Sequence, residues 1–598
     1  MHVTHAESDI VIIFAARFLY GEGCRRRRRR MTADARAFTG RGMTSSNKNT
    51  IDQNRFDFIV VGAGSAGCVL ANRLSANGEH RVLLIEAGGR DNSINIHVPL
   101  MVVNLLKDEK YTWPFMTEKQ VHLNGKEQLW ARGKVLGGSS SINGNVYVRG
   151  DPAEYDSWSS LGCSGWSWED MLPYFKRMET FASGDPVKRG KSGPINVNQL
   201  KNFDKLADAY LDANREAGFE LVDDYNDGHY EGSSYLQYST TPRGFRCSSA
   251  VGYLRPARGR SNLAIWTNTL VTKILLDGKR AIGVECRRDD KTIQAFSRKE
   301  VIVSAGPIQS PKILELSGIG RADVLKAVGI DVAHELPGVG ENMSDHPNCR
   351  LTFECSQPIT INDVLQRPLS KLKEGLRFIF FGKGLLSICS ATAHTVMRSG
   401  PGQNQPDLKL QLQPFSGKDR YARRPKDGLD PHSGFTIGIM ALRPHSRGYI
   451  HIKSADPAVQ PRIDPNYLAD ERDAATLLAG IRAVRRLVEM PSLKKLVVRE
   501  TRPGPEVQTE QQILDYIRLT TQTTWHVVGS CKMGNDELAV VDSDLLVHGM
   551  EGLRVIDSSV FPTVPSSNTN APTIALGEKG ADIVLKAWNN RAVTTAAA

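Results

Sequence analysis

The sequence predicts an α/β fold. Three observations predict it, in chain order: an apolar run over residues 56–61 (FDFIVV), a glycine-rich turn over 62–67 (GAGSAG) and a second apolar run over 82–85 (VLLI). Both runs have strand length and contain β-branched residues, and a helix pattern lies between them. The order strand, turn, helix, strand is that of a Rossmann-like unit.

The turn has the spacing Gly62-x-Gly64-x-x-Gly67, and Ser65 lies inside it. Such glycines allow a tight turn, a close backbone approach to a pyrophosphate and helix-to-strand packing, and the N-terminus of the helix attracts the phosphates. Glu86 ends the second apolar run 24 residues after Gly62, where a carboxylate can accept hydrogen bonds from ribose hydroxyls. The pattern therefore predicts a dinucleotide site, and at this point both NAD and FAD satisfy it.

Charge and composition exclude several other classes of protein. The chain has 598 residues, 40% of them hydrophobic and 24% charged, as in a globular protein of enzyme size. Of the net charge of +11, the first 54 residues hold 10 Lys and Arg against 5 Asp and Glu, including six arginines at 25–30. Because the rest is only mildly basic, we expect no nucleic-acid partner.

The apolar run at 10–20 follows acidic residues and precedes the arginines, the reverse of a secretory signal. With Met31 and Met43 as alternative starts, we interpret residues 1–54 as a disordered or spurious leader. No apolar run elsewhere reaches the roughly 18 residues of a membrane-spanning helix. We therefore expect no transmembrane segment.

The cysteines and histidines form no recognisable ligand pattern. The nine cysteines are odd in number and scattered without C-x-x-C, which favours a reduced compartment and predicts a cytoplasmic location. The 14 histidines show no metal-binding spacing, so no metal site is expected.

Two long motifs carry a family resemblance. Residues 133–152 (GKVLGGSSSINGNVYVRGDP) and 306–320 (GPIQSPKILELSGIG) resemble the two diagnostic patterns of the glucose-methanol-choline (GMC) family of flavin oxidoreductases. The resemblance extends from about residue 55 to about residue 588. It implies FAD, a discontinuous FAD-binding domain and a second, substrate-side α+β domain.

Within this resemblance, residues 55–345 are expected to form mainly the FAD-binding domain with substrate-side insertions. Residues 346–443 are the variable substrate-side region, in which 359–386 is a candidate lid. Residues 444–588 are expected to supply substrate-domain elements, then the catalytic His and Asn segment, and then to return to the FAD-binding domain. The FAD contacts implied by the resemblance are Gly62, Gly64, Ser65, Gly67, Glu86, Gly137, Ser139, Asn143, Val271 and Asp557. Some relatives tether FAD through a histidine in the glycine-serine loop, where this chain has Ile142 and Asn143, so non-covalent FAD is expected.

Residues 523–534 (TTWHVVGSCKMG) resemble the active-site histidine segment of the family. Oxidation of an alcohol by hydride transfer needs a base for the hydroxyl proton, and an imidazole suits that task near neutral pH. His526 is therefore the predicted base, although a lone histidine can also be a buried structural one. The segment departs from the commonest form of the family at Val527 and Ser530, and Trp525 fits either a cavity wall or the core.

The family's second catalytic position maps to Asn570, whose amide could orient the alcohol oxygen. A local interpretation is compatible with this role: Asn570 stands as an N-cap, with Pro572 close behind it, before a helix pattern at 573–588. Such a helix would direct its positive end toward the flavin.

The resemblance predicts oxidation of a primary alcohol to the aldehyde, with hydride transfer to flavin N5. Electrons then pass to a non-oxygen acceptor, a quinone or another carrier, as in choline dehydrogenases, through which the protein could sit at a membrane surface. One alternative is an oxidase that uses O2 and releases H2O2. Another is a hydroxynitrile lyase, in which both catalytic positions are histidine, so that Asn570 argues against it.

Overall fold

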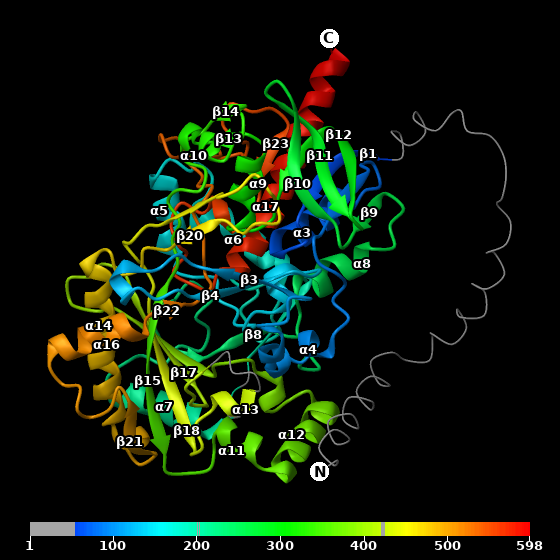
Figure 1. The fold of residues 1–598 in the computed structure, drawn as a ribbon. Helices are drawn as coiled ribbons and strands as arrows, with labels where there is room; N and C mark the ends of the chain where they lie inside the picture. The colour runs from blue at the N-terminus through cyan, green and yellow to red at the C-terminus, as the bar shows by residue number, and fades with distance from the viewer. Residues whose placement is uncertain (1–53, 200, 202–203, 420–424, 598) are drawn as a thin grey trace, which may run out of the picture.

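The computed structural model describes residues 54–597 except residues 200, 202–203 and 420–424. The predicted leader, apart from Asn54, lies outside the described residues. Two seven-stranded sheets, the helices that cover them and several smaller sheets make up the described chain (Figure 1). In the described part of the chain, no helix combines the length and the apolar character that crossing a membrane requires.

The first sheet confirms the Rossmann-like prediction. Its strands, in spatial order, are β10 (Leu270–Asp277), β11 (Arg280–Arg288), β12 (Lys291–Val303), β1 (Arg55–Val61), β2 (Val82–Ile85) and β9 (Leu263–Trp266), with β23 (Leu553–Val555) beside β12. Strands β12, β1, β2, β9 and β23 pair in parallel, whereas β10 to β12 form an antiparallel meander. Because β23 lies far along the chain from the other strands, this unit is discontinuous, as predicted.

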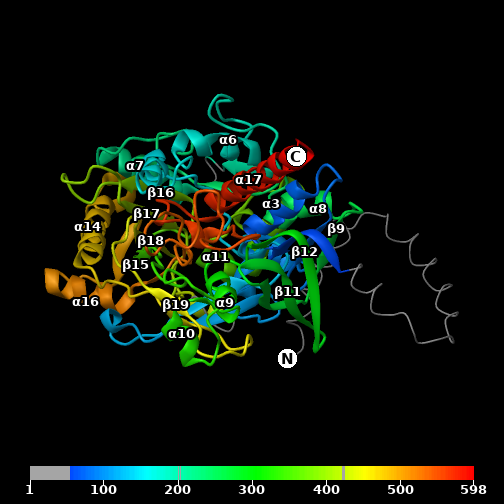
Figure 2. The ribbon, with the colours of Figure 1, turned by 90° about the horizontal axis from the view of Figure 1, so that it is seen from above.

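Two helices pack against each other beside this sheet. Helix α3 (Ser65–Leu74) follows the glycine turn, and α17 (Asn570–Ala597) is the C-terminal helix. Seen from above, they lie side by side (Figure 2). A Cβ atom on Gly577 of α17 would come within 3.1 Å of the Cα of Ala66 in α3, so a side chain there would push the helices apart.

The second sheet comes mainly from the region predicted to be variable. In spatial order it contains β21 (Val497–Arg502), β15 (Pro347–Cys355), β18 (Gly434–Ala441), β17 (Leu408–Gln413), β16 (Ala393–Met397) and β7 (Gly232–Tyr235), with β22 (Gln522–Thr523) beside β15. All of its pairings are antiparallel. Thus residues 346–443 supply the strands β15 to β18.

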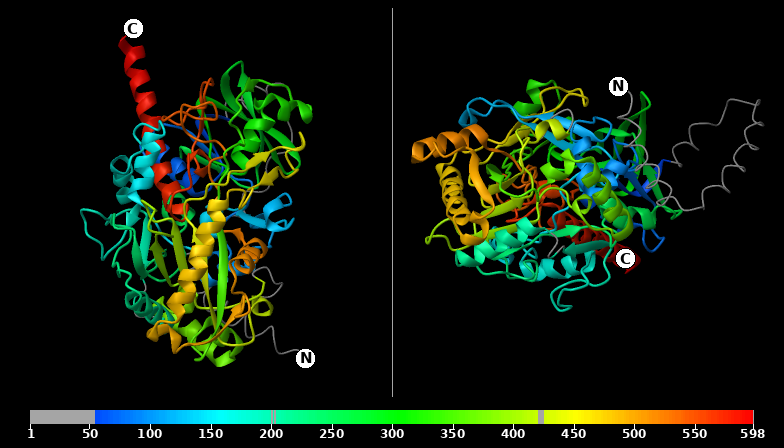
Figure 3. Two further views of the ribbon diagram at one scale, coloured as in Figure 1. Left: turned by 90° about the vertical axis from the view of Figure 1, so that its left-hand side faces the viewer. Right: turned by 90° about the horizontal axis from the view of Figure 1, so that it is seen from below.

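The two faces of the second sheet differ in character. Along β17, the leucines 408, 410 and 412 are buried in the core beneath α14 (Glu471–Val488), which lies along this face (Figure 3). The alternate side chains are polar and point to the other face, because side chains alternate along a strand. Gln411 and Gln413 on that face line the cavity described below.

Shorter elements connect the two units. The remaining strands are β3 (Thr112–Met116), β4 (Leu129–Gly133), β5 (Glu179–Thr180), β6 (Ile195–Gln199), β8 (Gln237–Ser239), β13 (Ile319–Gly320), β14 (His334–Glu335), β19 (Tyr449–His451) and β20 (Arg462–Asp464). The remaining α-helices are α4 (Ile94–His97), α5 (Pro152–Ser160), α6 (Trp168–Met178), α7 (Lys205–Glu216), α8 (Arg255–Ala257), α9 (Gln309–Leu316), α10 (Ala322–Ala327), α11 (Ile361–Gln366), α12 (Pro368–Phe381), α13 (Pro425–Gly428), α15 (Pro491–Lys494) and α16 (Glu510–Thr520). The candidate lid, 359–386, folds into α11 and α12.

Candidate active site

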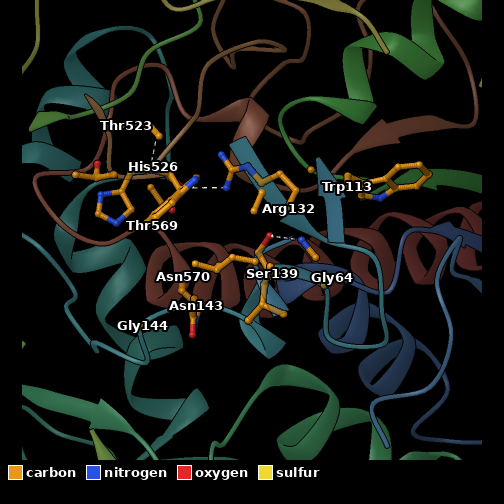
Figure 4. A pocket seen from close by; sticks show the side chains of 18 of the residues that line it. Gly64, Trp113, Arg132, Ser139, Asn143, Gly144, Thr523, His526, Thr569 and Asn570 are labelled. Carbon is orange, nitrogen blue, oxygen red and sulfur yellow. Dashed lines mark hydrogen bonds between the residues drawn. The ribbon is translucent and has the colours of Figure 1, made fainter. Parts of the chain in front are cut away.

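A cavity of about 510 Å3 is lined by residues of both units. The glycine turn after β1 and the acidic end of β2 form one part of its wall, and the polar face of the second sheet forms another. Figure 4 shows residues from the glycine turn, from β4 and from the His526 loop around this one space. The cavity therefore brings the predicted dinucleotide turn and the predicted base together.

The glycine turn has no room for side chains. Gly62 has φ of +97°, and a Cβ atom on it would lie 2.5 Å from the carbonyl oxygen of Ser304. Gly64 is the N-cap of α3, and no side chain caps this end of the helix. Since Gly64 and Ser65 line the cavity, the first-turn N–H groups of α3 are available to an anion there.

Glu86 lies in the cavity wall, 6% exposed. Its two carboxylate oxygens accept hydrogen bonds from the backbone N–H of Ala63 at 2.9 Å and of Gly88 at 2.8 Å. Burial raises the pKa of this carboxyl to about 7, and the two N–H donors oppose that shift. Each oxygen keeps a lone pair for a hydroxyl of a bound ribose, and Val271 of β10 lines the same cavity.

The glycine-serine loop closes on the glycine turn. Gly138 has φ of +51°, and a Cβ atom there would lie 2.7 Å from the Cα of Gly64. Ser139 and Asn143 of this loop line the cavity. Gly67 and Gly137, both predicted as cofactor contacts, are not among the lining residues.

Packing explains these two glycines. A Cβ atom on Gly67 would lie 1.9 Å from the carbonyl oxygen of Gly62, and one on Gly137 would lie 2.2 Å from Oγ of Ser141. They shape the turn and the loop without facing the cavity.

Asp557 follows β23 and lines the cavity from the other side. Its carboxylate accepts from the N–H of Gly306 at 2.9 Å, from Oγ of Ser310 at 2.6 Å and from the N–H of Ser559 at 2.8 Å. Burial raises the pKa of this carboxyl, and these donors oppose the rise. Asp557 thereby connects the 306–320 motif to the segment that follows β23, and Ser310 has a structural task.

Asn570 also lines the cavity. The prediction that it is the N-cap of the C-terminal helix is wrong. It is the first residue of α17, and its side-chain Oδ1 accepts a hydrogen bond from Oγ of Ser65 at 2.8 Å. The amide oxygen is thus used by the glycine turn, so that Nδ2 is the donating end of the side chain. The bond joins the first residue of α3 to the first residue of α17, and both helices begin at the cavity.

A buried carboxylate holds the backbone of His526. The N–H of His526 donates to Oδ1 of Asp345 at 2.7 Å, and the other oxygen accepts from Thr523 Oγ1 at 2.6 Å and from the hydroxyl of Tyr467. Trp525 has φ of +61°, an unusual conformation for a bulky residue. It lines the cavity, which resolves the choice between cavity wall and core in favour of the wall.

A chain of hydrogen bonds determines the protonation of the His526 ring. Nε2 of His346 is 3.0 Å from the carbonyl oxygen of Leu442 and must donate to it, so Nδ1 of His346 is an acceptor. Nδ1 of His526, 3.0 Å away, is then the donor, which leaves the lone pair on its Nε2. Nδ2 of Asn568 donates to that Nε2 at 3.0 Å.

Both imidazoles are neutral in this environment. Burial lowers the pKa of His346 to about 3. Burial also lowers the pKa of His526 far below its ordinary value, and the neighbouring side chains of His346, Lys409 and Arg132 act in the same direction. A neutral imidazole with its lone pair at Nε2 is the form that can accept a proton.

Four residues around His526 were not predicted as site residues. His346 and Asn568 are the hydrogen-bond partners of the His526 ring. Nζ of Lys409 donates to Oδ1 of Asn568 at 3.3 Å. Nη1 of Arg132 donates to the carbonyl oxygen of Trp525 at 2.9 Å. Asn568 lies two residues before the predicted Asn570, and His346 is the first residue of the region predicted to be variable. Lys409 has no sequence signal other than a cation in an otherwise apolar and amide-rich strand.

The comparisons with known proteins agree with this architecture. Models of the GMC oxidoreductase family match residues 56–348 and 444–577. The oxygen-dependent choline dehydrogenase of Photobacterium profundum is 41% identical over 538 residues, which cover 89% of this chain and 93% of that protein.

Two solved structures share the fold. Pyridoxine 4-oxidase from Mesorbium loti superposes with a TM-score of 0.79 at 28% identity, covering 88% of this chain and 98% of that one. An FAD-dependent oxidoreductase from Chaetomium thermophilum superposes with a TM-score of 0.82 at 28% identity, covering 89% and 100%. With both parts of the family pattern matched and a relative at 41% identity over most of its length, the chain belongs to the GMC oxidoreductase family, the FAD-dependent oxidoreductases that act on CH–OH groups.

Proposed function

We propose that this protein oxidises a primary alcohol to the aldehyde, with His526 as the base that takes the hydroxyl proton. The observation that carries the proposal is the acceptor Nε2 of His526 in the wall of the cavity that also contains the dinucleotide turn; Nδ2 of Asn568 donates to it, and the alcohol hydroxyl would replace that donor. An alcohol that loses its proton gives up hydride far more readily than a neutral alcohol. A neutral base at this position therefore suits the reaction.

The residues of the cavity fit FAD. Gly62 and Gly138 leave the space that a pyrophosphate needs beside the N-terminus of α3, and Glu86 offers carboxylate lone pairs to a ribose. Ser139, Asn143, Val271 and Asp557 complete the proposed contacts. When bound, FAD supplies the hydride acceptor at flavin N5.

Asn570 is the proposed second catalytic residue. Because its Oδ1 is held by Ser65, its Nδ2 can donate to the alcohol oxygen without titrating. The N-terminus of α17 begins at the same residue and gives a positive dipole end for negative charge on the cofactor ring.

We propose that FAD is held without a covalent bond. Among the described residues that line the cavity, His526 is the only histidine, and it has the role of the base. The glycine-serine loop presents Ile142 and Asn143 at the position where some relatives carry a tethering histidine.

We propose a non-oxygen electron acceptor, in line with the relatives that are named choline dehydrogenases without mention of oxygen. The second candidate is an oxidase, because the name of one relative includes "oxygen-dependent" and one structural neighbour is an oxidase. A cytoplasmic location is supported by the eight described cysteines, all of which are free thiols.

The experiment is anaerobic titration of the purified flavoprotein with a panel of primary alcohols, followed by readmission of air. Bleaching of the flavin absorbance by an alcohol is the expected result. Slow recovery of the colour in air would indicate a dehydrogenase, and fast recovery with H2O2 release an oxidase. An intact flavin spectrum with every alcohol, together with cleavage of a cyanohydrin, would contradict the proposal and favour the lyase.

A further inference from the structure

The charges around the cavity bear on which alcohol the site accepts, an inference that rests on the proposed function. Among the described lining residues, the only carboxylates are Glu86, Asp419 and Asp557. Glu86 and Asp557 are held by backbone N–H groups of the dinucleotide turn and of the 306–310 motif. Asp419 is solvent-exposed and follows the far end of β17. None of the three belongs to the His526 network.

The sheet face opposite the cofactor turn is polar, and Arg350, between Asn348 and Thr352 on β15, is a cation that lines the cavity. The other hydrogen-bonding side chains of this face are amides and hydroxyls, namely Asn348, Thr352, Gln411, Gln413 and Thr436. Such groups can satisfy hydroxyl, carbonyl or carboxylate oxygens of a substrate. A quaternary ammonium group has no hydrogen to donate and is bound by aromatic faces together with carboxylates. Aromatic side chains do line the cavity (Trp113, Phe115, Phe415 and Trp525), but among the described lining residues no carboxylate accompanies them at the His526 network.

Lys409 lies directly behind the proposed base, and burial lowers the pKa of its ammonium group to about 7, so that it is a cation in acidic to neutral solution. It lies on the same face of β17 as Gln411 and Gln413, and its side chain is fully buried. Its ammonium contacts Oδ1 of Asn568, the residue whose Nδ2 binds His526. Within the described chain, no carboxylate forms an ion pair with it.

Arg132 adds a second cation on the other side of the His526 loop. It lines the cavity and donates to a neutral acceptor, the carbonyl oxygen of Trp525. Asp345 partly offsets its charge. That carboxylate does not line the cavity, however, and it already accepts from Thr523, Tyr467 and the N–H of His526.

We propose that the site selects alcohols without a positive charge, so that a quaternary ammonium alcohol such as choline is a poor substrate, with Lys409 and Arg132 as the residues that disfavour it. Like charges in a cavity screened from water repel each other strongly, and such repulsion is an effective means of rejecting a ligand. The selectivity thus differs from that in the printed name of the choline dehydrogenase relative.

The test compares two alcohols of one shape: choline, and 3,3-dimethylbutan-1-ol, in which carbon replaces the ammonium nitrogen. Anaerobic stopped-flow of the holoenzyme at pH 6, below the pKa of about 7 to which burial lowers Lys409, gives the rate of flavin reduction and the apparent Kd for each. We expect the ratio of rate to Kd to favour the neutral alcohol about tenfold or more. Equal or better reduction by choline would overturn the inference and leave the proposed function intact.

The charge of Lys409 is tested by Lys409→Met, which keeps the side-chain length. We expect the preference for the neutral alcohol to fall several-fold in this variant and to stay unchanged in Lys494→Met, an exposed lysine on α15. An unchanged preference in soluble, flavin-loaded Lys409→Met would remove this residue from the proposal. If that variant does not fold, the comparison of choline with 3,3-dimethylbutan-1-ol in the wild-type enzyme tests the proposal alone.

Two further results also have a defined meaning. If only other alcohols reduce the flavin, the same two compounds are compared as competitive inhibitors, and the same ranking is expected. If no alcohol reduces it, the proposed function fails and this inference fails with it.

Discussion

Nδ1 of His526 lies 3.0 Å from Nδ1 of His346, and the two imidazole planes meet at 87° with ring centroids 5.2 Å apart. Because His346 is itself anchored to the carbonyl of Leu442, the proton between the two rings belongs to His526. The consequence is a lone pair on Nε2, on the side of the ring that contacts Asn568.

Replacement of the proposed base is the first prediction. His526→Ala should lower the rate of flavin reduction by about 10² to 10⁴, the usual contribution of a general base. The measurement is anaerobic stopped-flow on protein whose flavin content matches the wild type. A rate within about threefold of the wild type would remove His526 from the proton transfer.

The two ends of the Ser65–Asn570 hydrogen bond allow a matched comparison. Asn570→Ala removes the donor proposed for the alcohol oxygen, and about a tenfold to hundredfold loss in flavin reduction is expected. Ser65→Ala removes the same hydrogen bond but keeps the amide, so a smaller loss is expected. Equal losses in the two variants would assign Asn570 a purely structural role.

The acid limb of the pH profile should report on the charges that face His526. Since burial, His346, Lys409 and Arg132 all hold its pKa down, wild-type flavin reduction should stay fast at pH values below the ordinary histidine pKa of 6.5. In Lys409→Met one of these cations is gone, so the pKa of His526 rises and the acid limb moves to higher pH. An acid limb that stays in place would exclude electrostatic coupling between the two residues.

Gly62 should be intolerant of any side chain. Gly62→Ala would place Cβ 2.5 Å from the carbonyl oxygen of Ser304, and we expect a lower melting temperature and a lower flavin-to-protein absorbance ratio. Gly78→Ala is the control, because Gly78 also has positive φ, +81°, but nothing lies within 4 Å of the added atom. Equal effects would indicate that backbone strain, not the lost space, dominates.

Acid precipitation of the wild type should also release free FAD if no covalent bond exists.

His451 gives a pH-dependent stability prediction away from the active site. Its Nδ1 lies 2.6 Å from Glu315 and its Nε2 3.0 Å from Glu341, and these carboxylates raise the pKa of His451 to about 9 despite burial. Because the folded pKa exceeds the ordinary value of 6.5, the stabilisation is fully present below pH 6.5 and is lost as pH rises through 9.

His451→Gln should therefore lower the free energy of unfolding by up to about 3 kcal/mol at pH 6, and by much less at pH 9.5. Burial of Glu315, which raises the pKa of that carboxyl, offsets part of the gain. Denaturant unfolding at the two pH values measures the difference, and His229→Gln, at an exposed pair with Glu220, is the control. A pH-independent loss would contradict the ion-pair account.

Much of the FAD-side unit was predictable because its signals are local. The strand at 56–61, the glycine turn and the strand at 82–85 lie within one short stretch, and hydrophobic runs and glycine spacing report local backbone requirements. Even there, the sequence did not separate Gly64, which lines the cavity, from Gly67, which packs against Gly62.

The wrong prediction for Asn570 has a long-range cause. A cap was predicted from the neighbouring helix pattern, whereas the partner of the side chain is Ser65, 505 positions away. The same holds for His346 and His526, which are 180 positions apart and whose ring orientation depends on a third residue, Leu442.

By itself, the sequence determined that the chain has a glycine turn on a Rossmann-like unit, and it predicted His526 and Asn570 as catalytic residues, because these inferences rest on patterns of neighbouring residues. Only the tertiary structure decided which nitrogen of His526 carries the lone pair and that Lys409 lies buried behind it. The reason is physical: protonation and pKa depend on burial and on hydrogen-bond partners, which here come from strands and loops distant in the chain.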